Sequence, residues 1–271
     1  MQKIVSLAVV VAVLALAACD VKVNDKGLSL NLGRANATDA WTRTYDLQPG
    51  GRLEIVNTNG LIEAIGSEGP KVEVRAERRA RAGSQEEAAA LLKKIEMRED
   101  VSATLVRIEA RTSEGATGFR SSFDVQYHVR IPDGLSVSFR TANGAINLQN
   151  LNGRIAAATT NGGISGSGLS GEVEMQSVNG GVQADLSSVS GDIKLTTVNG
   201  TVRLDLPSDV KADLDASCVN GGISVDDRFN VNTSGEDSRR RVTAALNGGG
   251  PRISAATVNG GIRIRARGGR S

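Results

Sequence analysis

The chain has 271 residues, with 32 Lys and Arg against 30 Asp and Glu, one His and two Cys. So few histidines and cysteines cannot supply the four nitrogen or sulfur ligands of a structural zinc site. The formal net charge of +2 lacks the basic excess of a dedicated nucleic-acid-binding protein, so no nucleic-acid partner is expected. Aromatic residues make up only 3% of the chain, although large compact cores normally use them to fill volume. The composition favours a repetitive structure with a thin core.

The N-terminus has the character of an export signal. The run from Ile4 to Leu16 is almost entirely apolar, has the length of a signal-peptide core and is too short to span a bilayer. It ends in Leu16-Ala17-Ala18-Cys19, which resembles the lipobox of bacterial lipoproteins. That resemblance implies cleavage between Ala18 and Cys19, a signal peptide over residues 1–18, and acyl chains on Cys19 that hold the mature chain on a membrane. A buried N-terminal helix that happens to end in cysteine is the alternative.

The lipidated residue is followed by a polar stretch. Residues 19–40 are rich in Asn, Asp, Lys and Gly, which predicts a flexible tether between membrane and domain. The alternation in Leu28-Ser29-Leu30-Asn31-Leu32 would instead allow a first short strand.

An Asn-Gly dipeptide recurs along the C-terminal half, at intervals of 18, 18, 20, 21 and 39 residues. Its asparagines are Asn143, Asn161, Asn179, Asn199, Asn220 and Asn259. In every copy an apolar residue stands three positions after the asparagine and another stands six positions before it, so each repeat holds two short strands. A period near 20 is typical of a solenoid. The sequence therefore predicts an all-β fold, a parallel β-solenoid with coils of ~20 residues.

Asn-Gly between two alternating runs can also form a tight hairpin turn, so a meander of hairpins is the competing interpretation. A meander does not require equivalent residues of successive repeats to match, whereas a parallel stack places them directly above one another. The matching columns favour the stack. Stacked asparagines can hydrogen-bond to each other, so the six asparagines are interpreted as a structural ladder.

The sequence of residues 41–140 predicts an N-terminal β-rich cap region with one helix. The segment from Leu53 to Ile62 looks like an earlier copy of the coil motif. Ser84-Gln85-Glu86-Glu87 is a capping box, and the apolar residues that follow fall on one face, which predicts a helix over about 85–97. The segments Val101–Ala110 and Phe123–Ile131 read as strands.

The repeats occupy residues 141–266 and are interrupted by a predicted loop over 227–247. Gly248-Gly249-Gly250-Pro251 then returns the chain to a last coil. Arg263, Arg265, Arg267 and Arg270 make the end of the chain basic, with residues 267–271 as a tail. Such a cluster could contact anionic phospholipid or lipopolysaccharide phosphate, or it could be a polar cap that stops end-to-end stacking.

One column of the repeat carries carboxylates, namely Asp185, Asp205 and Asp226. Three carboxylates at stack spacing repel each other unless water, a cation or an arginine offsets the charge, so the row is a weak candidate for a Ca²⁺ site. A solvated face with splayed side chains is the alternative. Cys218 stands in an inward column of Thr and Ser, which predicts a small buried residue rather than a reactive thiol. His128 has no partner that the sequence can identify and is interpreted as an ordinary strand residue.

The chain resembles the bacterial putative-adhesin, β-strand-repeat domain family of unknown function. The resemblance rests on Asn57-Thr58-Asn59-Gly60-Leu61-Ile62, the capped helix, Arg130-Ile131-Pro132-Asp133, the Asn-Gly coils and the segment from Gly248 to Ile262. It spans about residues 41–266 and implies the β-repeat fold. Members of that family are commonly secreted, lipid-anchored or membrane-tethered, and no catalytic residues carry over from them.

The expected function is therefore that of a lipid-anchored, noncatalytic scaffold or binding module in the bacterial cell envelope, on the periplasmic side of the inner or outer membrane. Its expected partners are the membrane, through Cys19, and an envelope protein or a glycan; no cofactor is expected. The alternative is a polysaccharide-active or Ca²⁺-binding protein that uses the Asp row. Sugar sites usually contain stacking rings, and from residue 142 onward only Phe229 is aromatic, which disfavours the enzyme. The family resemblance also admits a partner of envelope-stress signalling proteins.

Overall fold

The computed structural model describes residues 20–24, 27–31, 35–112, 121–229, 231–233 and 240–267. The predicted signal peptide, its cleavage site at Ala18 and Cys19, and tail residues 268–271 lie outside these ranges. The described chain is all-β with one short helix, as the sequence predicts.

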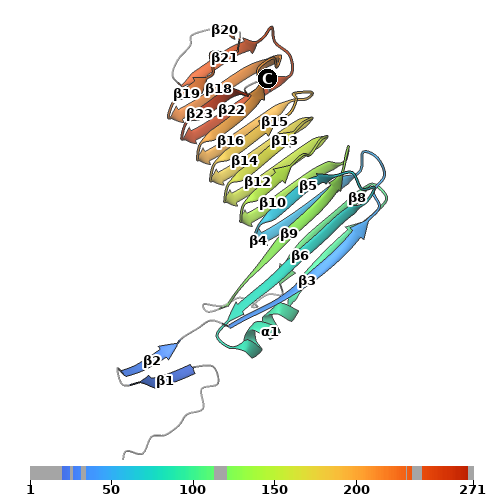
Figure 1. Ribbon diagram of the computed structural model, residues 1–271, viewed down its shortest axis with the longest axis vertical. Helices are drawn as coiled ribbons and strands as arrows, with labels where there is room; N and C mark the ends of the chain where they lie inside the picture. Colours follow the sequence, from blue (N-terminus) through green and yellow to red (C-terminus); the bar gives the residue numbers. More distant parts are fainter. Residues whose placement is uncertain are drawn as a thin grey trace, which may run out of the picture.

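Most strands belong to two sheets (Figure 1). Sheet I has 11 strands in the spatial order β20 (Val231–Thr233), β21 (Arg241–Leu246), β18 (Ala212–Asn220), β22 (Arg252–Asn259), β16 (Ile193–Asn199), β14 (Glu172–Asn179), β12 (Arg154–Asn161), β10 (Ser136–Asn143), β4 (Arg52–Asn59), β8 (Leu105–Thr112) and β7 (Ile95–Val101). Sheet II has 10 strands in the order β19 (Ile223–Val225), β23 (Ile262–Arg267), β17 (Val202–Pro207), β15 (Val182–Leu186), β13 (Ile164–Leu169), β11 (Ile146–Gln149), β5 (Ile62–Ser67), β9 (Ser122–Pro132), β6 (Val72–Ala82) and β3 (Ala35–Tyr45). The hairpin of β1 (Asp20–Asn24) and β2 (Gly27–Asn31) is a separate sheet.

A coil consists of one strand of sheet I, an Asn-Gly turn and one strand of sheet II. Successive coils are parallel and in register, with Val137 opposite Ile155 in sheet I and Ile146 opposite Ile164 in sheet II. The earlier copy of the motif is confirmed, because β4 and β5 pair with β10 and β11 as a further coil. Figure 1 shows the coils stacked along the long axis, with β3, β6 and β9 running obliquely below them.

The core lies between the two sheets and is made by the inward columns. Along one column of sheet I, Phe139 of β10 is followed by Ala157, Met175 and Leu195 in the next coils. All four side chains are at most 3% exposed. The predicted buried position of Cys218 is confirmed, since this residue is 6% exposed.

The helix is shorter than the sequence predicts. α1 spans Gln85–Lys93 and packs against β3 and β6, with Ala88 and Leu91 buried. Ser84 is its N-cap, and its hydroxyl accepts a hydrogen bond from the backbone N–H of Glu87 at 3.2 Å. The predicted end at residue 97 is wrong, because Ile95 and the residues after it pair with β8 as the edge strand β7. The alternation of Ile95, Glu96 and Met97 also fits a strand, and the hydrogen bonds of the sheet decide the outcome.

The last coil does not lie at the end of the stack. β22 and β23 pair with β16 and β17 on one side and with β18 and β19 on the other. The C-terminal coil is therefore inserted between two coils that precede it in sequence, so the order of the coils in the stack differs from their order in the chain.

The glycine-rich turn makes this insertion sterically feasible. β21 lies antiparallel on the outer edge of β18, and the chain then crosses the start of β18 to place β22 on its inner edge. A Cβ on Gly250 would lie 2.6 Å from the carbonyl oxygen of Lys211, so a side chain would block the crossing. The Asn247 amide donates to the carbonyl oxygens of Ser208 and Val210 at 3.0 and 2.8 Å and fixes the turn.

Two predicted segments also contain more structure than expected. The stretch 19–40 includes β1, β2 and the start of β3, so the alternative of a short strand near Leu28 holds for β2. The predicted loop 227–247 includes β20 and β21, which extend the end of sheet I.

Candidate binding surface

A ladder of asparagine side chains runs along one edge of the stack, at the turns between the two sheets. Six of these side chains donate from Nδ2 to the Oδ1 of a neighbouring rung, at 2.8–2.9 Å. In spatial order the rungs are Asn59, Asn143, Asn161, Asn179, Asn199, Asn259 and Asn220. The sequence pattern gives six of these residues, and Asn59 of the early coil extends the ladder.

A second ladder lies just inside the first, in the inward column of Thr and Ser that also contains Cys218, and its hydrogen bonds could not be predicted from the spacing. Two positions before five of the seven asparagines stands a buried Thr or Ser, whose hydroxyl donates to the glycine carbonyl oxygen of the neighbouring turn, as Thr197 does to Gly180 at 2.7 Å. Thr159, Ser177 and Thr257 make the same bond at 2.9 Å. A buried carbonyl without a partner is destabilising, so this column explains why these inward positions are polar.

Two shallow grooves flank the asparagine ladder. The groove on sheet I has a volume of about 410 Å³ and includes Thr160, Val178 and Val198. Val178 is 41% and Val198 39% exposed, and the next coils continue the column with Val258 and Val219. This side of the ladder is therefore an apolar stripe.

The groove on sheet II has a volume of about 370 Å³, and we call it the polar groove because a column of polar side chains projects into it; Ala145, Ile164 and Val182 also line it. One outward column supplies Asn147, Ser165, Gln183 and Arg203, which lie opposite one another in successive strands. Rungs of a parallel sheet are about 4.8 Å apart, so an elongated ligand would meet a hydrogen-bonding side chain at each step. The ladder thus separates a polar groove from an apolar stripe.

The predicted row of three carboxylates does not form. Asp185 and Asp205 are neighbours in register, but the inserted strand β23 places Arg265 on the far side of Asp205. Arg267 forms an ion pair with Asp185. Partial burial raises the pKa of the Asp185 carboxyl. The positive charge of Arg267 opposes this rise, and the negative charge of neighbouring Asp205 adds to it. Among the described residues, no group of three or more His, Cys, Asp or Glu is arranged to hold a metal ion.

Asp226 instead closes the edge of sheet II. β19 covers β23 only as far as Ile264, and the next backbone groups on that edge belong to Ala266. The Asp226 carboxylate accepts from the Ala266 N–H at 3.2 Å, and Arg228 donates to the Ala266 carbonyl oxygen. Arg228 also pairs with Asp226 at 2.7 Å and holds the pKa of that carboxyl well below its usual range. We call these two side chains the edge clasp, because they occupy the hydrogen-bonding groups that a further strand would use.

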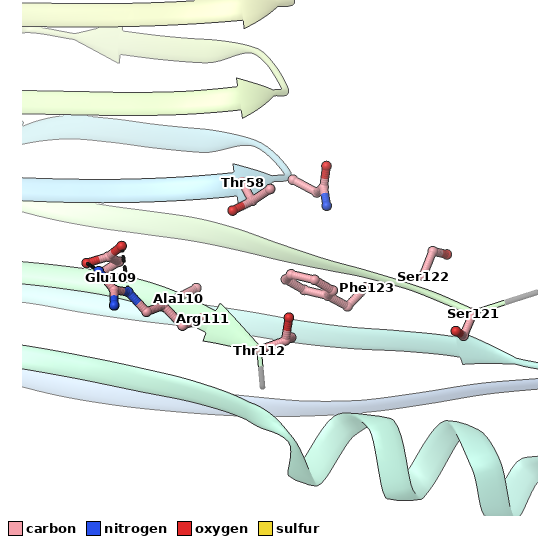
Figure 2. Close-up of a pocket in the computed structure, with 9 residues that line it drawn as sticks. Thr58, Glu109, Ala110, Arg111, Thr112, Ser121, Ser122 and Phe123 are labelled. Carbon is pink, nitrogen blue, oxygen red and sulfur yellow. Dashed lines mark hydrogen bonds and ion pairs between the residues drawn. The ribbon is translucent and has the colours of Figure 1, made fainter. Parts of the chain in front are cut away.

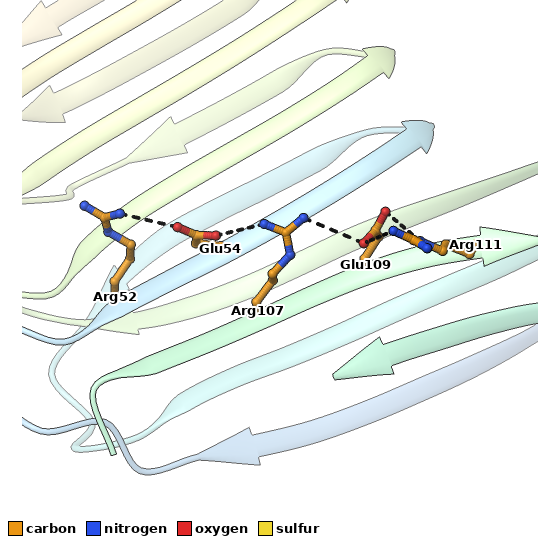
Figure 3. A network of polar contacts seen from close by, with 5 residues as sticks. All are labelled: Arg52, Glu54, Arg107, Glu109 and Arg111. Atoms are coloured by element: carbon orange, nitrogen blue, oxygen red, sulfur yellow. Dashed lines mark hydrogen bonds and ion pairs between the residues drawn. The ribbon is translucent and has the colours of Figure 1, made fainter. Parts of the chain in front are cut away.

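Ion pairs cover the outer face of sheet I near its N-terminal end. Figure 3 shows a chain of contacts from Arg52 through Glu54, Arg107 and Glu109 to Arg111, with distances of 2.8–3.7 Å. The hydrogen bond from Arg111 lowers the pKa of Glu109. Such exposed pairs contribute little individually, and their alternation keeps this face charged and soluble.

A hollow of about 480 Å³ lies beside this network, where β4 and β8 end and the longer strand β9 extends past them (Figure 2). Thr58, Asn59, Arg111, Thr112 and Phe123 contribute to its lining. Asn59 is the first rung of the ladder and accepts from Asn143, so the ladder ends at this hollow.

His128 lies in a second hollow, of about 430 Å³, on the outer face of sheet II. Its Nδ1 is 2.9 Å from a carboxylate oxygen of Glu63. The strand register places Arg75 on the other side of His128, and Thr42 beyond Arg75. Two strand spacings of about 4.8 Å separate Thr42 from His128, so the imidazole cannot activate that hydroxyl.

The match to a known family follows this repeat architecture. A family model described as Toastrack DUF4097 matches residues 100–265, which is more than half of the chain. The chain belongs to this Toastrack family. The resemblance seen in the sequence is thereby confirmed, and the Toastrack match includes the coils from β10 to β23 and excludes α1.

Two solved structures are similar to this Toastrack chain. One is described as a putative cell adhesion protein from Clostridium sporogenes, with 12% identity, coverage of 84% of this chain and 100% of that chain, and a TM-score of 0.40. The other is described as a putative adhesin from Bacteroides fragilis, with 13% identity, coverage of 84% and 97%, and a TM-score of 0.41. Among curated proteins, no sequence matches this chain. Within the described residues, no helix has the length and apolar character needed to cross a bilayer.

Proposed function

We propose that the chain is a noncatalytic binding module of the bacterial cell envelope, anchored on the membrane by acyl chains on Cys19. In this proposal the coils act as a parallel β-solenoid, whose rigid faces present the binding surface to an envelope protein or a glycan. The lipobox-like segment that ends at Cys19 supports the anchor, and it would place the domain outside the cytoplasm.

The polar groove beside the asparagine ladder carries the binding part of the proposal. Its outward side chains repeat with the spacing of the coils, and backbone hydrogen bonds between strands fix their positions. A surface of equivalent sites at regular spacing suits an elongated ligand with repeated polar groups, such as an extended peptide or an oligosaccharide. Gln183 and Asn147 offer both donors and acceptors for such a ligand.

Two arrangements in the molecule argue against catalysis. The carboxylates that an acid–base mechanism would have used are separated by Arg265 or engaged by Arg267 and Arg228. The His128 imidazole has a carboxylate partner, but the neighbouring position in the sheet is Arg75 and not a nucleophile. Binding without chemistry is the function that this surface supports best.

Site-specific photo-crosslinking in intact cells tests the binding surface. A photoreactive residue in place of Ser165, inside the groove, should give a defined adduct, whereas the same residue in place of Glu68, exposed in the turn between β5 and β6, should not. Adding Gln183→Trp in the next rung should abolish the Ser165 adduct because it fills the groove. Equal adduct yields at the two positions, or none at Ser165, would contradict the proposal.

Mass spectrometry of the mature N-terminus tests the anchor separately. The proposal expects an acylated Cys19 as the first residue and a membrane-associated chain. Cys19→Ala should remove the acyl mass and release the protein from washed membranes. A mature chain that begins elsewhere, or that stays on membranes after this substitution, would refute lipid anchoring.

A further inference from the structure

Two arginines meet at the C-terminal end of the polar groove. Arg203 of β17 is the last residue of the groove column, and Arg263 of the inserted β23 lies directly opposite it. These residues are 60 positions apart in the sequence, and only the insertion of the last coil brings them together. Both point away from the core, as the neighbouring Val202, Leu204, Ile262 and Ile264 are buried.

No carboxylate neutralises this pair within the described part of the chain. The nearby acids are engaged elsewhere, with Asp185 paired to Arg267 and Asp226 paired to Arg228. Asp205 lies opposite Arg265 in the next outward row. Neighbouring like charges on adjacent strands are unfavourable, so the pair gains most from an anion that binds both guanidinium groups.

The surroundings orient one of the two side chains. The Nη1 of Arg203 donates to the amide oxygen of Gln183 at 3.2 Å. Its Nε is buried and has no hydrogen-bond partner among the described atoms. Arg203 is thus half-buried and held from the groove side, while Arg263 is exposed. An anion at this point would lie at the end of a column of neutral hydrogen-bonding side chains.

We propose that Arg203 and Arg263 form a binding site for the phosphate group of a polar ligand, whose uncharged hydroxyl groups extend along Gln183, Ser165 and Asn147. This inference rests on the proposed binding function and names the chemistry of its ligand. A phosphate presents several oxygens to guanidinium groups that project from strands about 4.8 Å apart, so one phosphate group can bind both arginines at once. A phosphorylated sugar and a phosphoglycerol lipid headgroup share this chemistry.

Calorimetric titration of the full chain, purified in nonionic detergent, tests the site. The probes are glycerol 3-phosphate, inorganic phosphate and, as a neutral control, glycerol. Wild type should bind the two phosphate compounds and not glycerol, with an affinity that falls as ionic strength rises. The Arg203→Gln, Arg263→Gln double variant should weaken binding by about tenfold or more. Arg154→Gln, which removes an exposed arginine paired with Glu172 on the other sheet, should leave binding unchanged.

The source of the phosphate is resolved by competition. If detergent micelles doped with phosphatidylglycerol compete with glycerol 3-phosphate but phosphatidylcholine micelles do not, the site takes a lipid headgroup. If neither lipid competes while glycerol 3-phosphate binds, the site takes a soluble phosphorylated compound. Both results support the site, provided that the double variant loses the binding.

Two results would overturn it, namely no phosphate binding by wild type or equal binding by the double variant. A Ser165 adduct that persists in such a case would leave the proposed binding function standing and remove only the phosphate site. If the Ser165 adduct is also absent, both the phosphate site and the proposed binding function are refuted.

Discussion

The coil stack and the long-strand region fill the core between the two sheets in different ways. In the stack, the strands of sheet II have 4–6 residues, as in β11, β13, β15 and β17, and each coil repeats the same small set of side chains. In the long-strand region, β3, β6 and β9 have 11 residues each and are antiparallel to one another. The regular coils fill their core with the same small set of side chains in every repeat, whereas the long strands fill theirs with side chains that differ from position to position.

The distribution of aromatic residues follows this difference. Among the described residues, Trp41, Tyr45, Phe123, Tyr127 and Phe139 belong to the long strands or to the first coils, and Phe229 alone lies beyond them. Large rings fill the space where the long strands meet the stack, and Ala, Val, Leu and Ile suffice between regular coils. The low aromatic content of the chain is thus a property of the coils.

The largest effect is expected at the boundary between the two regions. Phe139 is fully buried in the coil next to β4, and the same column continues with Ala157. Phe139→Ala should lower the free energy of unfolding by about 3–5 kcal/mol, because it leaves a cavity. Ala157→Phe, one coil further, should cost about 1–3 kcal/mol by overpacking. Denaturant titration measures both changes. An unchanged free energy of unfolding in Ala157→Phe would show that the core has room for a second large ring at position 157, and would contradict a core that narrows after Phe139.

Turn glycines should be essential in the stack. A Cβ on Gly180 would lie 2.0 Å from the carbonyl oxygen of Gly162 in the neighbouring coil. Gly180→Ala should therefore cost about 3 kcal/mol, because the coils would have to move apart. Gly222, the second glycine of the turn after Asn220, has open space around it, so Gly222→Ala should change stability by less than about 0.5 kcal/mol. Similar losses for the two variants would show that tight stacking is not what selects glycine.

The asparagine ladder predicts an effect that depends on position. Asn179 makes two side-chain bonds, to Asn161 and from Asn199, whereas Asn220 makes one, to Asn259. Asn179→Ala should lower the free energy of unfolding by about 1–2 kcal/mol, and Asn220→Ala by about half as much. Equal losses at the two rungs would mean that the hydrogen bonds between neighbouring asparagines add no stability beyond that of the individual turns.

The smallest effect concerns the two ends of the molecule. The long-strand end exposes charged edge strands such as β7, whereas the other end relies on the edge clasp of Asp226 and Arg228. Asp226→Ala should expose the backbone of Ala266 and produce concentration-dependent association in sedimentation experiments, and Asp227→Ala should not. A strictly monomeric Asp226→Ala protein would argue against this role of the clasp.

The clasp also predicts a pH dependence with a definite sign. Arg228 lowers the pKa of Asp226, so the stabilisation is complete above the ordinary aspartate pKa of about 3.9 and declines as the pH falls through the lowered value. The difference in stability between wild type and Asp226→Ala should therefore shrink on acidification. Acid titration of unfolding for the two proteins measures it, and a difference that grows at low pH would be inconsistent with the ion pair.

Much of the stack is readable from the sequence because each column has its own chemical requirement. Asn143 and its equivalents, the apolar positions that flank them and the early coil at Leu53 all follow from the spacing. The C-terminal end of the helix could not be predicted from the spacing, because Ile95 fits the apolar face of a helix and a buried position of a strand equally well. The hydrogen bonds of β7 with β8, set by the tertiary fold, decide between them.

The spatial order of the last coils could not be predicted for a related reason. The segments Val219-Asn220-Gly221-Gly222-Ile223 and Val258-Asn259-Gly260-Gly261-Ile262 have the same residues at every ladder position, so either could follow the coil of Asn199. The run Gly248–Gly250 is the one local signal of a tight crossing. Without this order, the spacing predicts a continuous row of Asp185, Asp205 and Asp226, and it does not indicate that Arg203 and Arg263 are neighbours.

Disulfide trapping of the inserted coil tests this account most directly. In a Cys218→Ser background, Lys194→Cys with Ser254→Cys places two thiols on adjacent strands, because Lys194 lies opposite Ser254. Lys194→Cys with Asp215→Cys joins coils that are adjacent in sequence order but separated by β22. An inserted coil should give a rapid intramolecular disulfide in the first pair and none in the second, whose Cα atoms are about 10 Å apart. A disulfide in the second pair and none in the first would contradict the insertion, the broken Asp row and the paired arginines together.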